Sequence, residues 1–100
     1  MKVVISPSTN SKKKYMAVFV AEAKDSPSFK KKTVHFGSAG MSDFTKNKDE
    51  ERKQRYLDRH RKNENWGDPT TAGSLSRYVL WNLPTLRASI ADFKRRFKLK

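Results

Sequence analysis

Four basic residues in the second half of the chain have the spacing of a single helix face. They follow one another at intervals of three, four and three residues, as Arg52, Arg55, Arg59 and Lys62. On an α-helix these positions fall within an arc of roughly 80°. Arginine binds phosphate and carboxylate groups through planar, paired hydrogen bonds. The spacing therefore predicts a cationic ridge that binds a phosphate backbone or an acidic protein groove.

The same ridge is also expected of a solvated helix face. Glu51 lies four residues before Arg55, and Asp58 lies four residues before Lys62, so both acids could pair with basic residues of the ridge. The large net charge of the whole chain favours the binding interpretation.

Nine further basic residues are candidates for phosphate contact. They form two lysine triplets and a group near the carboxyl terminus: Lys12, Lys13, Lys14, Lys30, Lys31, Lys32, Arg87, Lys94 and Arg95. Lysine on an edge strand also prevents aggregation by sheet pairing, and basic residues late in a helix complement its dipole. These structural roles explain the triplets and the last group as well as phosphate binding does.

The whole chain shares this excess of positive charge. Its 100 residues contain 23 Lys and Arg against 10 Asp and Glu, which gives a net charge of +13. Nucleic acid is the leading expected partner, with DNA favoured, because each phosphate that Lys or Arg neutralises releases condensed counterions. All eight Arg lie from Arg52 onward, while residues 1–46 hold nine Lys and no Arg. The second half is therefore predicted to be the more specific binding surface.

No catalytic or metal-binding set emerges from the sequence. The chain has no Cys, and its two His, His35 and His60, are far apart, so neither a metal site nor another cofactor is expected. Gly37 and Gly40 lack the spacing of a phosphate-binding loop and its Lys. We therefore expect a protein that is not an enzyme. Because no signal peptide or membrane span is evident, we also expect it to be intracellular.

Three strands are predicted to position the lysine triplets. Short runs rich in β-branched and aromatic residues, separated by turn residues, indicate a small antiparallel sheet. Its strands are expected over about residues 2–6, 14–21 and 32–37. The first two strands are expected to form a hairpin with residues 12–14 near its tip.

Three helices are predicted to follow the sheet, over about residues 48–62, 69–82 and 85–97. The first carries the cationic ridge on its surface. The second is expected to begin with Asp68 as its N-cap and Pro69 at its first helical position.

Strands followed by helices indicate one α+β domain over residues 1–100. The domain divides into a Lys-rich strand half, residues 1–46, and an Arg-containing helical half, residues 47–100. The last three residues, 98–100, are expected to fray.

Most aromatic residues are expected to lie in the core. Tyr15, Phe19 and Phe36 could share one face of the sheet, where they would either stack on bases or fill the core, and we expect the core. Trp66 could fasten the loop beside the ridge to the core or lie exposed at a contact surface, and we expect the first. An apolar stripe marks the last predicted helix: Leu86, Ile90, Phe93 and Phe97.

Several motifs in the second and middle parts of the chain carry a resemblance. They are Thr-Val-His-Phe-Gly at 33–37, Ser-Asp-Phe-Thr at 42–45, the basic run at 51–61, Asn-Trp at 65–66, Asp-Pro-Thr-Thr-Ala-Gly at 68–73 and Ser-Ile-Ala-Asp at 89–92. Over about residues 33–97 the chain resembles a family of small, basic, uncharacterised proteins encoded by large double-stranded DNA viruses of eukaryotes. The resemblance implies a viral protein located in the virion, the viral factory or the host nucleus, and it assigns no residue a role.

Three roles fit these features. The first is sequence-tolerant nucleic-acid binding or genome packaging, because phosphate contacts give affinity but little sequence information. The second is a protein-interaction module that docks the ridge on an acidic surface of a histone or viral protein. The third is a structural virion component. A membrane-surface role is not expected, because Tyr56 and Leu57 alone form the apolar face of the ridge helix.

Overall fold

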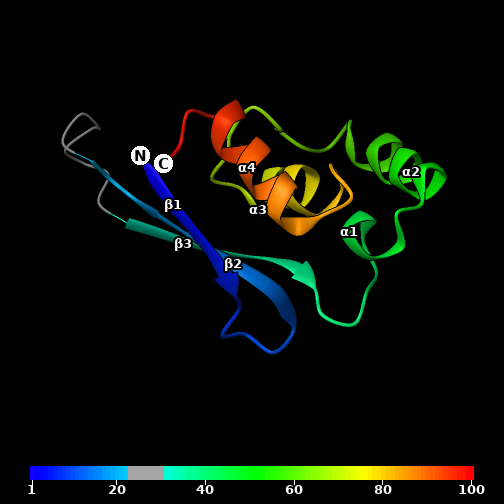
Figure 1. The fold of residues 1–100 in the computed structure, drawn as a ribbon, viewed down its shortest axis with the longest axis horizontal. Coiled ribbons are helices and arrows are strands. Elements are labelled where there is room, and N and C mark those ends of the chain that lie inside the picture. The colour runs from blue at the N-terminus through cyan, green and yellow to red at the C-terminus, as the bar shows by residue number, and fades with distance from the viewer. Residues whose placement is uncertain (23–30) are drawn as a thin grey trace.

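Three antiparallel strands form one sheet, and the helices of the second half gather on one side of it (Figure 1). The structure is a computed structural model that describes residues 1–22 and 31–100. Strands β1 (Lys2–Pro7), β2 (Lys13–Val20) and β3 (Lys31–Ser38) lie in that order, with β2 in the centre. The predicted strands and the α+β class are confirmed.

The sheet contributes one layer of the core. Val3 pairs with Phe19, and Tyr15 pairs with Phe36, so alternate side chains of neighbouring strands share one face. Val3, Ala17, Phe19 and Phe36 are each at most 1% exposed. Phe19 and Phe36 therefore fill the core, as predicted.

A short helix that the sequence analysis did not predict connects the sheet to the ridge. Helix α1 (Phe44–Asn47) is capped by Asp43, whose Oδ1 accepts a hydrogen bond of 2.9 Å from the backbone N–H of Thr45. The helix ends at Lys48, whose φ of 51° is left-handed and cannot continue a helix. The predicted ridge helix therefore cannot begin at residue 48.

Helix α2 (Glu50–His60) carries the ridge and is slightly shorter than predicted. Asp49 caps it by accepting a hydrogen bond of 3.1 Å from the backbone N–H of Arg52. Tyr56 and Leu57 are its buried residues, which confirms that this helix lies on the surface with a thin apolar face.

The second predicted helix begins later than expected, and its predicted N-cap is wrong. Helix α3 (Ala72–Leu75) is capped by Thr71, whose Oγ1 accepts a hydrogen bond of 3.1 Å from the backbone N–H of Ser74. Asp68 accepts instead from the backbone N–H and the hydroxyl of Thr70, at 2.9 and 2.7 Å. Asp68 thus forms a local turn with Thr70, and the helix begins after Thr71.

The helix continues from α3 as a π-helical segment, η1 (Ser76–Leu80). Its wider turn is closed by a hydrogen bond of 3.0 Å from the backbone N–H of Trp81 to the carbonyl of Ser76. Leu75 and Val79 are fully buried, which confirms that this is a core helix. π-Helical turns of this kind frequently lie at functional sites.

Helix α4 (Leu86–Arg96) packs its predicted apolar stripe against η1 and the core. Phe93 is fully buried, and the other members of the stripe are partly buried against it: Leu86, Ile90 and Phe97. The stripe is therefore confirmed.

The two ends of the chain lie side by side (Figure 1). The backbone N–H of Lys100 donates to the carbonyl of Met1 at 3.1 Å, and the N–H of Val3 donates to the carbonyl of Lys100 at 2.9 Å. The expectation that residues 98–100 fray is therefore wrong, because their backbone pairs with the open edge of β1.

Gly37 is expected to be the glycine that tolerates substitution least. Its φ is +78°, and a Cβ at this position would lie 2.8 Å from Cδ1 of Leu80, whereas Gly40 has a φ of +83° with nothing within 4 Å. Gly40→Ala therefore adds backbone strain alone, and Gly37→Ala adds overpacking of about 1–3 kcal/mol to a similar strain. Urea unfolding of both variants measures this difference, and equal losses of stability would contradict it.

Candidate nucleic-acid interface

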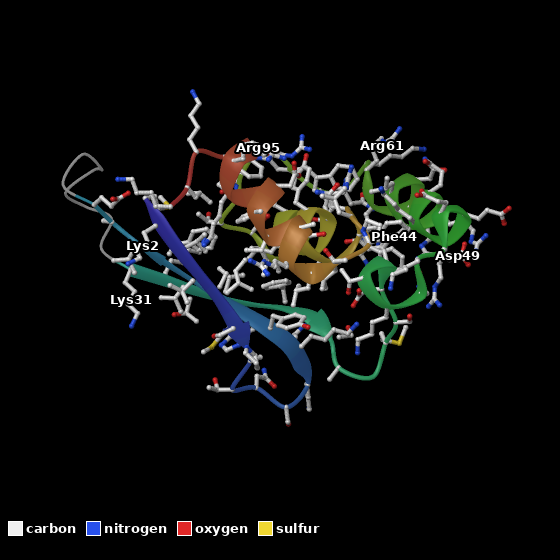
Figure 2. All side chains as sticks on the ribbon, in the orientation of Figure 1. Lys2, Lys31, Phe44, Asp49, Arg61 and Arg95 are labelled. Carbon is white, nitrogen blue, oxygen red and sulfur yellow. The ribbon has the colours of Figure 1, made fainter. Side chains whose placement is uncertain are left out.

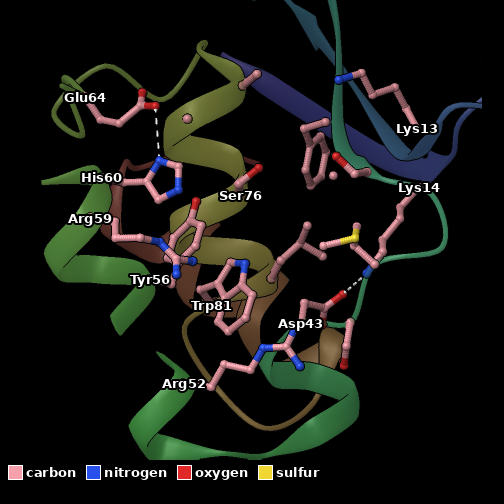
Figure 3. A pocket seen from close by; sticks show the side chains of 18 residues that line it. Lys13, Lys14, Asp43, Arg52, Tyr56, Arg59, His60, Glu64, Ser76 and Trp81 are labelled. Carbon is pink, nitrogen blue, oxygen red and sulfur yellow. Dashed lines mark hydrogen bonds and ion pairs between the residues drawn. The ribbon is translucent and has the colours of Figure 1, made fainter. Parts of the chain in front are cut away.

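A pocket of about 390 Å³ opens where the end of the sheet meets α2 and η1 (Figure 3). The sheet side consists of the start of β2, the end of β3 and the loop that leads to α1. The opposite side consists of α2, and the base consists of α3, η1 and Trp81. The polar and charged side chains that line it are Lys13, Lys14, Ser38, Ser42, Asp43, Arg52, Tyr56, Arg59, His60, Glu64 and Ser76.

Three cations surround the pocket, and we call Lys13, Arg52 and Arg59 the cationic rim. Lys13 comes from β2, while Arg52 and Arg59 come from α2. Cations from two segments that are far apart in the sequence therefore line the same pocket (Figure 3). Lys13 and Arg59 are exposed, and Arg52 is half-buried. Among residues 1–22 and 31–100, no carboxylate forms an ion pair with any of the three. The rim is therefore free to bind an anion.

A column of stacked rings forms one wall of the pocket. The rings of Tyr56 and Trp81 are parallel to within 9°, with their centroids 4.6 Å apart, and His60 covers the other face of Tyr56 at 4.4 Å. The column joins α2 to the end of η1 and thereby fixes the helix that carries Arg52 and Arg59. The rim is thus held on a rigid base.

The Glu64 carboxylate closes the upper end of this wall in Figure 3. Its Oε1 lies 3.8 Å from Nδ1 of His60. A Cβ at position 73 would lie 1.9 Å from Oε2 of Glu64, so any other residue at that position would displace this flexible side chain. Burial, together with the charge of Glu64, raises the pKa of Tyr56 to about 12. Tyr56 is therefore a neutral phenol at physiological pH, and it does not reduce the positive charge of the pocket.

Tyr56 is expected to make the protein less stable at high pH. The phenol of the unfolded chain titrates near 10, while that of the folded protein titrates near 12. Between these values the unfolded chain binds fewer protons, so the free energy of unfolding falls as pH rises. Ultraviolet absorbance of the phenolate and unfolding from pH 9 to about 12 measure the effect. Tyr56→Phe should lack this fall, and identical pH profiles for the two proteins would contradict the assignment.

Comparison with known proteins identifies the family to which the chain belongs. A family of unknown function (DUF5754) matches residues 3–60. The chain belongs to this family. Nothing matches among curated proteins or among solved structures.

The DUF5754 match covers the sheet, α1 and α2, and it ends at the last residue of α2. It therefore contains all three residues of the cationic rim, whereas α3, η1 and α4 lie beyond it. The family description names no activity.

In the structure, the side chains of the predicted ridge point in different directions. Arg52 and Arg59 line the pocket, while Arg55 points to solvent, 60% exposed, with its Nη1 4.0 Å from Glu51 Oε2. Such an exposed pair contributes little to stability. Lys62 is exposed in the turn after α2, because the helix ends two residues earlier than predicted.

The first lysine triplet is only partly available for binding. Lys12 and Lys13 are exposed at the β1–β2 hairpin. Lys14 was predicted as a phosphate contact, but its Nζ instead donates to Oδ2 of Asp43 at 2.5 Å. The two side chains are only 9% and 2% exposed. Lys14 is therefore a structural residue, because this buried carboxylate already neutralises it.

The second triplet lies at the other end of the sheet. Lys31 pairs in register with Val20, whereas Lys13 pairs with Ser38, so the two triplets are separated by the length of β2. Figure 2 shows Lys2 and Lys31 at one end of the molecule and Asp49 at the other. Lys31 and Lys32 are exposed but do not belong to the pocket, and Lys30 lies outside the described residues.

The predicted group on α4 also lies outside the pocket. Arg87 is exposed, Lys94 is half-buried, and Arg95 donates to Asp92 at 3.0 Å. Burial alone would raise the pKa of Asp92, but hydrogen bonds from Asn82, Arg95 and Arg96 outweigh it and lower the pKa below its ordinary value. Arg95 therefore stabilises α4 as well as adding surface charge.

Sequence reasoning missed the structural role of Arg77. Its guanidinium lies 5.5 Å from the ring of Trp66 and 4.9 Å from that of Tyr78, and its Nη1 donates to the carbonyl of Trp81. Burial lowers the pKa of Arg77. Trp66 packs against the core, so the prediction that it fastens the loop is confirmed. Arg77 thus holds Trp66 and the end of η1 together.

Neither a metal-binding cluster nor a membrane-spanning helix is found in the part of the chain that the structure describes. No group of three or more His, Asp or Glu side chains is placed there to hold a metal ion. Within the same residues, no helix has the length and apolar character needed to cross a membrane.

Proposed function

We propose that the protein binds nucleic acid by holding phosphates at the cationic rim. The observation that carries the proposal is the convergence of Lys13, Arg52 and Arg59 on one opening without an acidic partner among the described residues. A basic side chain that merely solubilises a small domain has no reason to face others across a pocket. Three such cations match the repeated charge of a phosphate backbone.

The binding is sequence-tolerant, because the rim offers charge and planar hydrogen-bond donors to phosphate oxygens. Lys12 beside the rim, Arg55 on the outer side of α2 and Lys62 in the turn after it are exposed and extend the positive surface. The net charge of +13 attracts a polyanion from a distance and speeds association. Genome packaging in an infected cell, the setting implied by the viral resemblance, is one use of such binding.

Fluorescence anisotropy of a labelled oligonucleotide at about 50 and 200 mM salt tests the proposal. Three phosphate contacts at the rim alone make the affinity fall by about 20-fold or more over this range, because each contact releases counterions. Further contacts along α2 make the fall steeper. No measurable binding, or an affinity that does not change with salt, would overturn the proposal.

A further inference from the structure

We propose that the pocket inside the cationic rim receives one unstacked nucleotide, and that the protein therefore prefers single strands to duplexes. This inference rests on the proposed function, since the rim must hold the phosphates on either side of the inserted base. The rim alone would bind any polyanion. The pocket adds a place for the base itself.

The size of the pocket fits one nucleotide. Its volume of about 390 Å³ lies near the lower end of the range for sites that enclose a small ligand. A paired base inside a duplex cannot enter such a pocket without first leaving the stack, which costs a few kcal/mol. A base in a single strand enters at much lower cost, so the pocket distinguishes the two forms of nucleic acid.

The walls combine flat apolar surface with a few polar groups, as a nucleobase requires. Phe36, Leu80 and Trp81 line the interior and are all buried parts of the core. The hydroxyl of Ser76 and the carboxylate of Glu64 are oriented along the same wall and can accept hydrogen bonds from base N–H groups (Figure 3). A site that binds phosphate alone does not need such an apolar interior.

The rim is arranged on both sides of the mouth. Lys13 lies on the sheet side, and Arg52 and Arg59 lie on the α2 side, about two helical turns apart (Figure 3). A strand that crosses the mouth therefore meets a cation before and after the inserted base. Free nucleotides share the chemistry of base plus phosphate, but they engage only one side of the rim and bind more weakly.

A residue at the mouth allows the pocket to be blocked without changing the charge. Ala72 lines the pocket and is exposed at the start of α3, so Ala72→Phe fills the opening. Ala91→Phe is the matched control, because Ala91 is exposed on α4 and does not line the pocket. Ser38→Phe blocks the mouth from the sheet side and serves as a second variant if Ala72→Phe fails to fold.

Affinities are measured for four probes at one salt concentration: a single-stranded oligonucleotide, the same sequence as a duplex, inorganic polyphosphate of equal charge and a free nucleoside monophosphate. The wild-type protein should bind the single strand about tenfold or more tightly than polyphosphate or the duplex, as expected for one held base. Ala72→Phe should remove this advantage and leave binding of polyphosphate unchanged. Ala91→Phe should behave as the wild type does.

The outcomes separate this inference from the proposed function. If the single strand, duplex and polyphosphate bind equally and Ala72→Phe changes nothing, the rim binds phosphate but the pocket holds no base, and the inference is wrong. If the free nucleotide binds as tightly as the single strand, the pocket serves a soluble nucleotide, and the preference for strands is wrong. If none of the probes binds, the proposed function itself is wrong.

Discussion

Replacing Lys14 with Met will lower the free energy of unfolding by about 3–5 kcal/mol, because it leaves a buried carboxylate without its counter-charge. Asp43 is 2% exposed and accepts hydrogen bonds from Lys14 with one oxygen and from Thr45 with the other. Met fills a volume similar to that of the Lys side chain, so the loss reports the charge and not a cavity. The change is read from urea denaturation curves.

Lys13 provides the matched control for this prediction. It is the same residue type one position earlier in β2, but it is exposed and forms no ion pair among the described residues. Lys13→Met should change the free energy of unfolding by less than about 0.5 kcal/mol. Similar losses for the two variants would show that Lys14 is not buried against Asp43. In a binding assay the pattern should reverse, with only Lys13→Met weakening association.

Replacing Arg52 and Arg59 together with Ala will weaken nucleic-acid binding by about 50-fold at 0.1 M salt, because two phosphate contacts and their released counterions are lost. The slope of log affinity against log salt should decrease in magnitude by about 2. Both side chains lie on the pocket side of α2 and form no ion pair within the described residues, so the fold should tolerate the change. Anisotropy titrations at several salt concentrations measure both quantities.

The control for this experiment removes the same charge elsewhere. Arg87 and Arg95 lie on α4, and neither lines the pocket. Replacing both with Ala lowers the net charge equally, so it should weaken long-range attraction but leave most of the salt slope intact. If the two double variants lose affinity and slope equally, binding depends on total charge and not on the rim.

The strands were predictable because their pattern is local. Val3, Phe19 and Phe36 belong to short runs of β-branched and aromatic residues bounded by turn residues, and each run became a strand with nearly the expected ends. The single turn of α1 was not predictable, because four residues are too few to show helical periodicity. Only the Asp43 cap marks its start.

The candidate site was predictable only in part, for a different reason. The spacing of Arg52 and Arg59 showed that they share a helix face, but it could not show that Lys13 faces them across a pocket. Nor could composition show that Lys14 is neutralised by Asp43, a residue 29 positions away. Such contacts depend on how the sheet end, α2 and η1 pack together, which no local pattern records.

The most direct test of the cationic rim is to map the contact by NMR while a short single-stranded oligonucleotide is added. The account predicts that the largest shifts occur at the Lys13 amide and at the backbone and guanidinium signals of Arg52 and Arg59. The end of the sheet that carries Lys2 and Lys31 should remain unchanged. Shifts centred on that end or on α4, with the rim signals unmoved at saturation, would contradict the account.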